Sequence, residues 1–355
     1  MRTMHQLHGG DWAAYEREYG ALPLDFSASV SPLGLPEGVR EAAAKALDNA
    51  GRYPDPRCTA LREALAAELA VPAEHIVCGN GAADLIDRLC RALRPRRALL
   101  PVPCFGEYRR ALRAAGSEIQ SFPLDERDGF TLPEALLEAI DGSVDILVLC
   151  QPNNPTGRTV EPELLRRIWR RCGESGTLLV LDECFLAFLD EPERYSLLPS
   201  LREEKKLVIL RAFTKSHGLA GLRLGYALCA DRELAETLSA TGQPWPVSQP
   251  AQAAGLAALR DGDYPRRLHA WIAAERPRLY AGLEQLGLRV VPGEGNFLLF
   301  YSENTALGEA LRPRGVLLRD CRDFEGLGPG WYRTAVRTEE ENDKLLKALG
   351  EVLDG

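Results

Sequence analysis

The 355-residue sequence lacks the patterns that identify several classes of protein. Its nine cysteines are scattered singly, and none forms a Cys-x-x-Cys pair or a Cys/His cluster with the spacing of zinc ligands. The odd number without a disulfide framework predicts reduced thiols and no metal site. No apolar run is long enough to span a membrane, and the N-terminus has no apolar signal segment. We therefore expect a cytoplasmic protein that does not bind membranes.

The sequence also lacks an excess of basic residues. The net charge of -8 argues against nucleic-acid binding, because no basic stripe is present to neutralise phosphates. Hydrophobic residues make up 45% and charged residues 26%, which is typical of a soluble globular enzyme. The length favours more than one domain. We expect an N-terminal arm (1–35) that packs against the small domain or a partner subunit, a large domain (36–245) and a small domain (246–355).

From residue 75 onward, short apolar runs alternate with helical patterns. This alternation is typical of an α/β fold with a mostly parallel sheet and helices on both faces. Segment 242–250 resembles a hinge, and one long helical stretch is expected from there to about residue 286. The later strands and helices predict a smaller α+β domain. The expected strands cover residues 75–79, 98–103, 145–150, 177–181, 207–210, 289–300, 316–320 and 331–336.

Polar side chains follow several of these strands. Lys215 lies just past strand 207–210, at the edge of the sheet where α/β proteins bind ligands, in a position suited to a Schiff-base amine. Asp182 closes a fully apolar strand, which is costly unless a cation lies near it. The guanidinium of Arg223 and the hydroxyl of Thr214 are suited to bind a phosphate. A Schiff-base lysine beside a phosphate-binding pair suggests pyridoxal phosphate as the ligand. Each feature has an ordinary structural alternative, but four groups, which are the Gly81 turn, Asn154, Asp182 and Lys215, all follow strand ends in one sheet, and this convergence argues against coincidence.

Over essentially its whole length the chain resembles the fold-type-I pyridoxal phosphate enzymes of the class I/II aminotransferase superfamily. The resemblance implies pyridoxal 5′-phosphate as cofactor, a large domain with a mostly parallel seven-stranded sheet, a smaller α+β domain, and a homodimer. The motifs that carry it are GNGAAD (79–84), PCFGEY (103–108), QPNNPTG (151–157), LDE (181–183) and FTKSHGLAGLRLGY (213–226).

The resemblance also implies a role for each matching residue that faces the cofactor. Lys215 would form the Schiff base and Asp182 would pair with the pyridinium nitrogen, so both are expected to be catalytic. Asn154 would bind the phenolic oxygen of the ring and border the substrate, and Tyr108 would stack on the ring. Tyr53 would come from the other subunit. The expected phosphate-binding residues are Gly81, Ala82, Thr214 and Arg223.

A second set is expected to bind a phosphorylated amino acid or amine. Arg333 matches the arginine that binds the substrate α-carboxylate, and Arg319 suits the substrate phosphate. His8 and Ser29 lie in the arm, which is expected to close over that phosphate. Two positions depart from the family pattern, because Phe185 replaces a frequent tyrosine and Ala212 replaces a frequent hydroxyl residue.

Two branches of the superfamily compete. Histidinol-phosphate aminotransferases share LAGLRLGY and the Tyr-Pro-Asp loop. Threonine-phosphate decarboxylases of cobalamin biosynthesis share these and also resemble the N-terminal HGG, QPWPVS and the segment around LLRDCRDFEG. We favour decarboxylation of O-phospho-L-threonine, with transamination of histidinol phosphate by 2-oxoglutarate as the alternative. A non-catalytic regulator is a third hypothesis, disfavoured because nothing resembles an appended DNA-binding domain.

Overall fold

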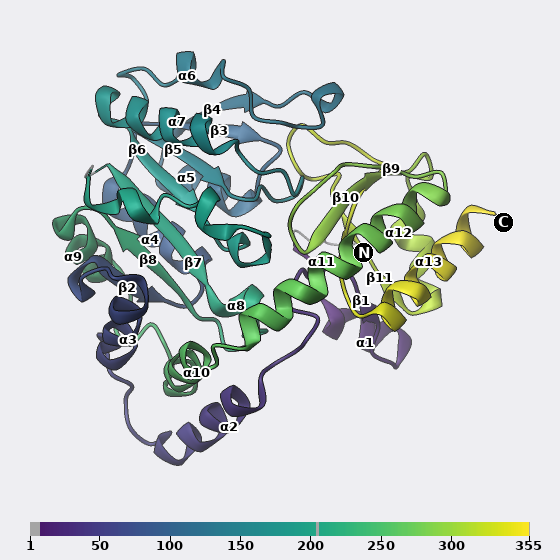
Figure 1. Ribbon diagram of the computed structural model, residues 1–355, viewed down its shortest axis with the longest axis horizontal. Helices are drawn as coiled ribbons and strands as arrows, with labels where there is room; N and C mark the ends of the chain where they lie inside the picture. Colours follow the sequence, from purple (N-terminus) through teal and green to yellow (C-terminus); the bar gives the residue numbers. More distant parts are fainter. Residues whose placement is uncertain (1–7, 204–205, 355) are drawn as a thin grey trace.

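The computed structural model describes residues 8–203 and 206–354, and this part of the chain contains one large sheet, one smaller four-stranded sheet and one two-stranded sheet (Figure 1). The large sheet has seven strands in the order β2-β8-β7-β6-β5-β3-β4. Strand β8 is antiparallel to both of its neighbours, whereas the other adjacent pairs are parallel. The predicted α/β class and mostly parallel seven-stranded sheet are therefore confirmed. Its strands are β2 (Ile76–Gly79), β3 (Arg97–Val102), β4 (Glu118–Pro123), β5 (Ile146–Cys150), β6 (Leu178–Asp182), β7 (Leu207–Ala212) and β8 (Gly225–Cys229).

Helices cover both faces of the large sheet because its central strands are apolar on both sides. Successive residues of β5 contribute to two different cores, with Leu147 and Leu149 on one face and Ile146 and Val148 on the other. Helices α2, α3, α7 and α10 pack on the first face, and α4, α5 and α9 on the second. These helices are α2 (Glu37–Ala46), α3 (Thr59–Leu69), α4 (Ala82–Leu93), α5 (Gly106–Ala114), α7 (Pro162–Ser175), α9 (Arg232–Thr241) and α10 (Gln249–Arg260).

Three features of this architecture were not predicted. Strand β4 alternates exposed and half-buried residues and so lacks a continuous apolar run. Strand β8, which follows the Gly-rich lysine motif, was not among the expected strands. The expected single helical stretch is two helices, α10 and α11 (Tyr264–Gln285), because the chain turns at Asp261 and Gly262. The domain boundary near residue 245 stays a prediction, and the apolar side of α10 belongs to the core of the large sheet.

The smaller sheet is antiparallel, with strand order β12-β13-β10-β9. Helices α11 and α13 bury their apolar sides against it in a separate core. The N-terminal arm joins this part of the molecule, since Leu24 of β1 pairs in parallel with Val316 of β11. These elements are α1 (Trp12–Tyr19), β1 (Leu24–Asp25), β9 (Arg289–Val290), β10 (Phe297–Tyr301), α12 (Leu307–Leu311), β11 (Val316–Leu317), β12 (Arg319–Asp320), β13 (Trp331–Ala335) and α13 (Glu339–Leu353). A further short helix, α6 (Leu136–Ala139), precedes β5.

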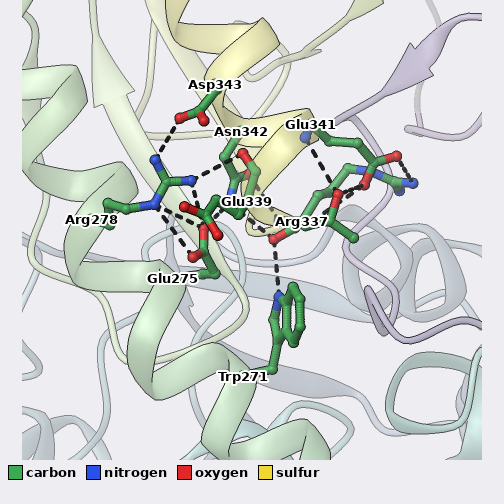
Figure 2. A network of polar contacts seen from close by, with 9 residues as sticks. Trp271, Glu275, Arg278, Arg337, Glu339, Glu341, Asn342 and Asp343 are labelled. Carbon is green, nitrogen blue, oxygen red and sulfur yellow. Dashed lines mark hydrogen bonds and ion pairs between the residues drawn. The ribbon is translucent and has the colours of Figure 1, made fainter.

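A buried polar network joins α11 to the start of α13 (Figure 2). The Asn342 amide donates to the Glu275 carboxylate and to the Arg337 carbonyl, both at 2.9 Å, and accepts from the Arg337 N–H at 3.1 Å. The Arg278 guanidinium donates to the same Glu275 carboxylate at 2.8 Å. Since a buried carboxylate is stable only when its oxygens are satisfied, this network fixes the packing angle of the two helices.

Replacing Asn342 by Ala should destabilise this part of the protein by about 2–3 kcal/mol, because it removes three hydrogen bonds that the amide makes with buried groups of Glu275 and Arg337. Denaturant unfolding followed by near-ultraviolet dichroism measures the loss. Asp343→Ala removes a neighbouring, exposed partner of Arg278 and should cost less than about 0.5 kcal/mol. Equal losses for the two variants would contradict the role of the buried amide.

Candidate active site

A cavity of about 700 Å³ opens at the carboxyl ends of the parallel strands, between the large sheet and the smaller one. Asp182 ends β6, and Lys215 lies in α8 (Phe213–Ser216), directly after β7. Most residues that the sequence predicts for the site line this cavity. They are His8, Ala82, Tyr108, Asn154, Asp182, Thr214, Lys215, Arg223, Arg319 and Arg333.

Three predicted residues do not border the cavity in the described part of the chain. Gly81 lies just behind its wall, at the N-cap of α4. Ser29 is fully buried, and its hydroxyl has no partner among the described residues, whereas Ser27 does line the cavity. Tyr53 is 77% exposed and stacks on Trp245, with ring centroids 4.2 Å apart. The roles predicted for these three residues stay predictions.

Asp182 is buried and accepts two hydrogen bonds. The Tyr108 hydroxyl donates to it at 2.6 Å and the Cys184 backbone N–H donates at 3.0 Å. Burial raises the pKa of the Asp182 carboxyl, and these donors oppose the rise. A buried carboxylate held in this way is suited to bind a cationic or N–H group that enters the cavity.

Tyr108 contacts Asp182 through its hydroxyl, a role that the sequence interpretation missed. Its ring is almost fully buried and meets the Phe105 ring edge-on, with centroids 5.5 Å apart. Phe105 is more exposed and also lines the cavity. Ring stacking by Tyr108 stays a prediction. The spacing of Phe105 and Tyr108 across the first turn of α5 could have suggested that one packs while the other donates.

Lys215 is half-buried and lines the cavity. Burial, with a smaller contribution from the positive charge of Arg333, lowers the pKa of the Lys215 amine to about 8. The N-terminal arm also positions the backbone of this residue, because the Ser31 N–H donates a hydrogen bond to the Lys215 carbonyl at 2.8 Å. An amine with this pKa is half unprotonated near pH 8, whereas an ordinary lysine is almost fully protonated there, so Lys215 can act as a nucleophile or a base.

An anion cradle lies beside Lys215, at the N-terminus of α4. The backbone N–H groups of this helix start, together with its dipole, favour a phosphate there. Gly81 has φ +79°, and a Cβ atom on it would lie 2.6 Å from the Arg223 guanidinium, so only glycine fits. Arg223 is held at the unusual φ of +58°, and Thr214 lies on the same side of the cavity. The N-terminus of α4, the Arg223 guanidinium and the Thr214 hydroxyl together provide the donors that a phosphate monoester needs.

Arg333 of β13 reaches across the cavity from the smaller sheet. It donates to the Asn154 side-chain oxygen and, at 2.9 Å, to the Ser27 carbonyl. Burial lowers the pKa of Arg333 to about 10, a value at which the guanidinium is still charged near neutral pH. Both of its partners are neutral, so its charge is available to a bound carboxylate.

Arg319 and His8 complete the outer part of the cavity. Arg319 is paired with Asp323 at 2.7 Å, and His8 lies 2.9 Å from the Glu107 carboxylate. Both carboxylates line the cavity as well, which the sequence interpretation did not anticipate. Arg319 and Asp323 are four residues apart in the chain, a spacing that could have suggested the pair.

The donor set fits pyridoxal 5′-phosphate, the cofactor expected from the sequence. The cradle around Gly81 suits its phosphate, Asp182 suits a protonated ring nitrogen, and Lys215 suits its aldehyde. By contrast, residues 8–203 and 206–354 contain no group of three or more His, Cys, Asp or Glu side chains that could hold a metal ion. Within the same ranges, no helix is long and apolar enough to cross a membrane.

Comparison with known proteins agrees with this geometry. Residues 23–349 match the family described as aminotransferase class I and II. The threonine-phosphate decarboxylase of Salmonella typhimurium is 38% identical, with 100% of this chain and 99% of the relative covered. The histidinol-phosphate aminotransferase of Methanopyrus kandleri is 34% identical over 95% of this chain and 91% of the relative. The crystal structure of the histidinol-phosphate aminotransferase from Clostridium acetobutylicum superimposes with a TM-score of 0.86 at 28% identity, covering 93% of this chain and 98% of that one. The chain belongs to the class I and II aminotransferase family.

The lowered pKa of Lys215 predicts how its reactivity depends on pH. An amine reacts with acetic anhydride only when it is unprotonated, so in cofactor-free protein the acetylation rate of Lys215 should be half-maximal near pH 8. Peptide mass spectrometry measures it site by site. Lys344 is the internal control, because its pairing with Glu340 raises its pKa. A Lys215 midpoint as high as that of Lys344 would contradict the burial argument.

Proposed function

We propose that this member of the class I and II aminotransferase family binds pyridoxal 5′-phosphate and decarboxylates O-phospho-L-threonine to aminopropanol phosphate and CO2. One observation carries the proposal: Lys215, with its pKa lowered to about 8, lines the same cavity as the buried Asp182 and the anion cradle. The relative from Salmonella typhimurium, similar over the full length, supports the choice of substrate.

The cofactor would be held by residues of the large sheet. Its phosphate would lie against Gly81, Ala82, Thr214 and Arg223, and its ring would extend toward Asp182. When bound, it supplies a protonated ring that withdraws electrons from the substrate Cα. Asp182 keeps that ring protonated, and Tyr108 orients Asp182 through its hydroxyl.

The substrate carries two anionic groups, and the cavity has cations placed for both. Arg333 would bind the α-carboxylate near Asn154. Arg319 and His8 would bind the phosphate at the outer end, where Asp323 and Glu107 now hold them. Decarboxylation breaks the bond from Cα to the carboxylate, the electron pair stays on the substrate, and a proton replaces CO2. Lys215 is the nearest group that can deliver that proton.

The wider setting follows from the same proposal. Decarboxylation of this substrate belongs to cobalamin biosynthesis, as the resemblance implies, and nine free cysteines suit a cytoplasmic protein. We also propose a homodimer in which Tyr53 serves the cofactor site of the partner subunit. Its exposed ring, outside its own cavity, is compatible with that arrangement.

Transamination of histidinol phosphate is the second candidate, favoured by the relative from Methanopyrus kandleri. Both reactions need the same cofactor and a phosphate-bearing substrate. They differ in which bond at Cα breaks, and only transamination consumes 2-oxoglutarate.

The deciding measurement is a product assay with O-phospho-L-threonine, run with and without 2-oxoglutarate. We expect CO2 and aminopropanol phosphate without the keto acid, and Lys215→Ala should reduce the rate by at least about 10³-fold. Glutamate formed from histidinol phosphate and 2-oxoglutarate, with no CO2 released, would make the protein an aminotransferase. A wild-type protein that stays colourless with added cofactor would overturn both and favour the non-catalytic regulator.

A further inference from the structure

Two phenylalanines from different parts of the fold meet beside the cavity, which Phe185 lines. Phe185 follows β6, and Phe297 begins β10 of the smaller sheet. Their rings are buried and meet edge-to-face, with centroids 4.9 Å apart and an angle of 74° between the planes. This is a preferred geometry for two aromatic rings, so each ring fixes the orientation of the other.

Each ring presents its face to a different cation. The Lys215 amine nitrogen lies 5.7 Å from the Phe185 centroid, and the Arg333 guanidinium carbon lies 5.2 Å from the Phe297 centroid. Both distances are within the roughly 6 Å over which a ring face attracts a cation. The aromatic pair therefore contacts Lys215, which we assign to the cofactor, and Arg333, which we assign to the substrate carboxylate.

Neither cation forms an ion pair with a carboxylate of the described residues. The Arg333 hydrogen bonds go to neutral oxygens of Asn154 and Ser27. On the opposite side of Asp182, by contrast, the next residue of the chain, Glu183, forms a buried ion pair with Arg211 at 2.7 Å. Desolvation opposes the charge of both Lys215 and Arg333, so some other favourable interaction must offset it.

We propose that Phe185 and Phe297 form a positioning platform that holds Lys215 and Arg333 as cations without occupying their N–H donors. A carboxylate at either position would neutralise the cation and compete with the substrate for the same donors. A ring face attracts the positive charge through its quadrupole and leaves the N–H groups free. This inference rests on the proposed function, since free donors matter only where an anionic substrate binds.

The first test is a pH titration of the visible absorbance of the cofactor-loaded enzyme. Phe185→Leu removes the ring face, so the protonated form of the nitrogen contributed by Lys215 loses a favourable contact. The midpoint should fall by about half to one pH unit. Phe188→Leu is the matched control, because Phe188 is fully buried in the same cluster, 6.3 Å from Phe185, and has no cation over its ring among the described residues. It should leave the midpoint unchanged. Equal shifts in the two variants, or none in Phe185→Leu, would overturn the proposal.

A second series keeps the fold intact should the leucine variants unfold. Phenylalanine analogues carrying one, two or three ring fluorines at position 185 keep the ring shape and weaken its quadrupole stepwise. The midpoint should fall with each fluorine, and a midpoint that does not move across the series would overturn the platform.

The second half of the proposal is tested through Phe297. In Phe297→Leu, the KM for the phosphorylated substrate should rise about two- to fivefold, with kcat much less affected, because Arg333 binds a group that persists through the reaction. A KM no different from that of Phe188→Leu would overturn this half. The titration needs only bound cofactor, so an aminotransferase outcome in the product assay would refute the proposed reaction and leave the test of the platform valid.

Discussion

Asp182 lies at the end of a strand whose residues are all buried, and a carboxylate there is destabilising unless donors or a cation offset its desolvation. Tyr108 and the Cys184 backbone supply two donors, and the remaining demand is for a positively charged group inside the cavity. The apolar strands that stabilise the sheet are therefore the same strands that raise the cost of Asp182. The fold thus leaves the charge of Asp182 only partly compensated, and the cationic ring of the proposed cofactor would complete the compensation.

The smaller sheet supplies what the large sheet lacks, which is a cation that faces the cavity from the opposite side. Arg333 is placed by pairing of β13 with β10, and its hydrogen bond to Ser27 also involves the arm. The arm then continues to Ser31, whose N–H binds the Lys215 carbonyl. Residues 27–31 thus connect Arg333 to the segment that carries Lys215. A movement of the smaller sheet would therefore shift Lys215 through this short piece of backbone.

Much of this arrangement could be predicted from the sequence, since β5, β6 and β7 are continuous apolar runs and their polar residues begin where the runs end. That signal placed Asp182 and Lys215 at the cavity. It could not give side-chain direction, which is why the hydrogen bond of Tyr108 to Asp182 was missed. Strand β4 was missed for the opposite reason: it lies at the edge of the sheet and needs no apolar run. Residues brought together by tertiary packing alone, such as Phe185 and Phe297, leave no pattern in the sequence.

The different partners of Arg333 and Arg319 affect how each can bind a substrate. Arg319 is paired with Asp323, so an anion that binds there must compete with a carboxylate already in place. Arg333 has neutral partners and binds an anion without displacing a charge. Release of Asp323 costs part of the binding free energy of the outer anion, and only a strongly charged group such as a phosphate monoester offsets that cost well. Under the proposed function, the Arg319–Asp323 pair would therefore discriminate against amino acids without a phosphate, and Arg333 would supply the affinity common to all α-carboxylates.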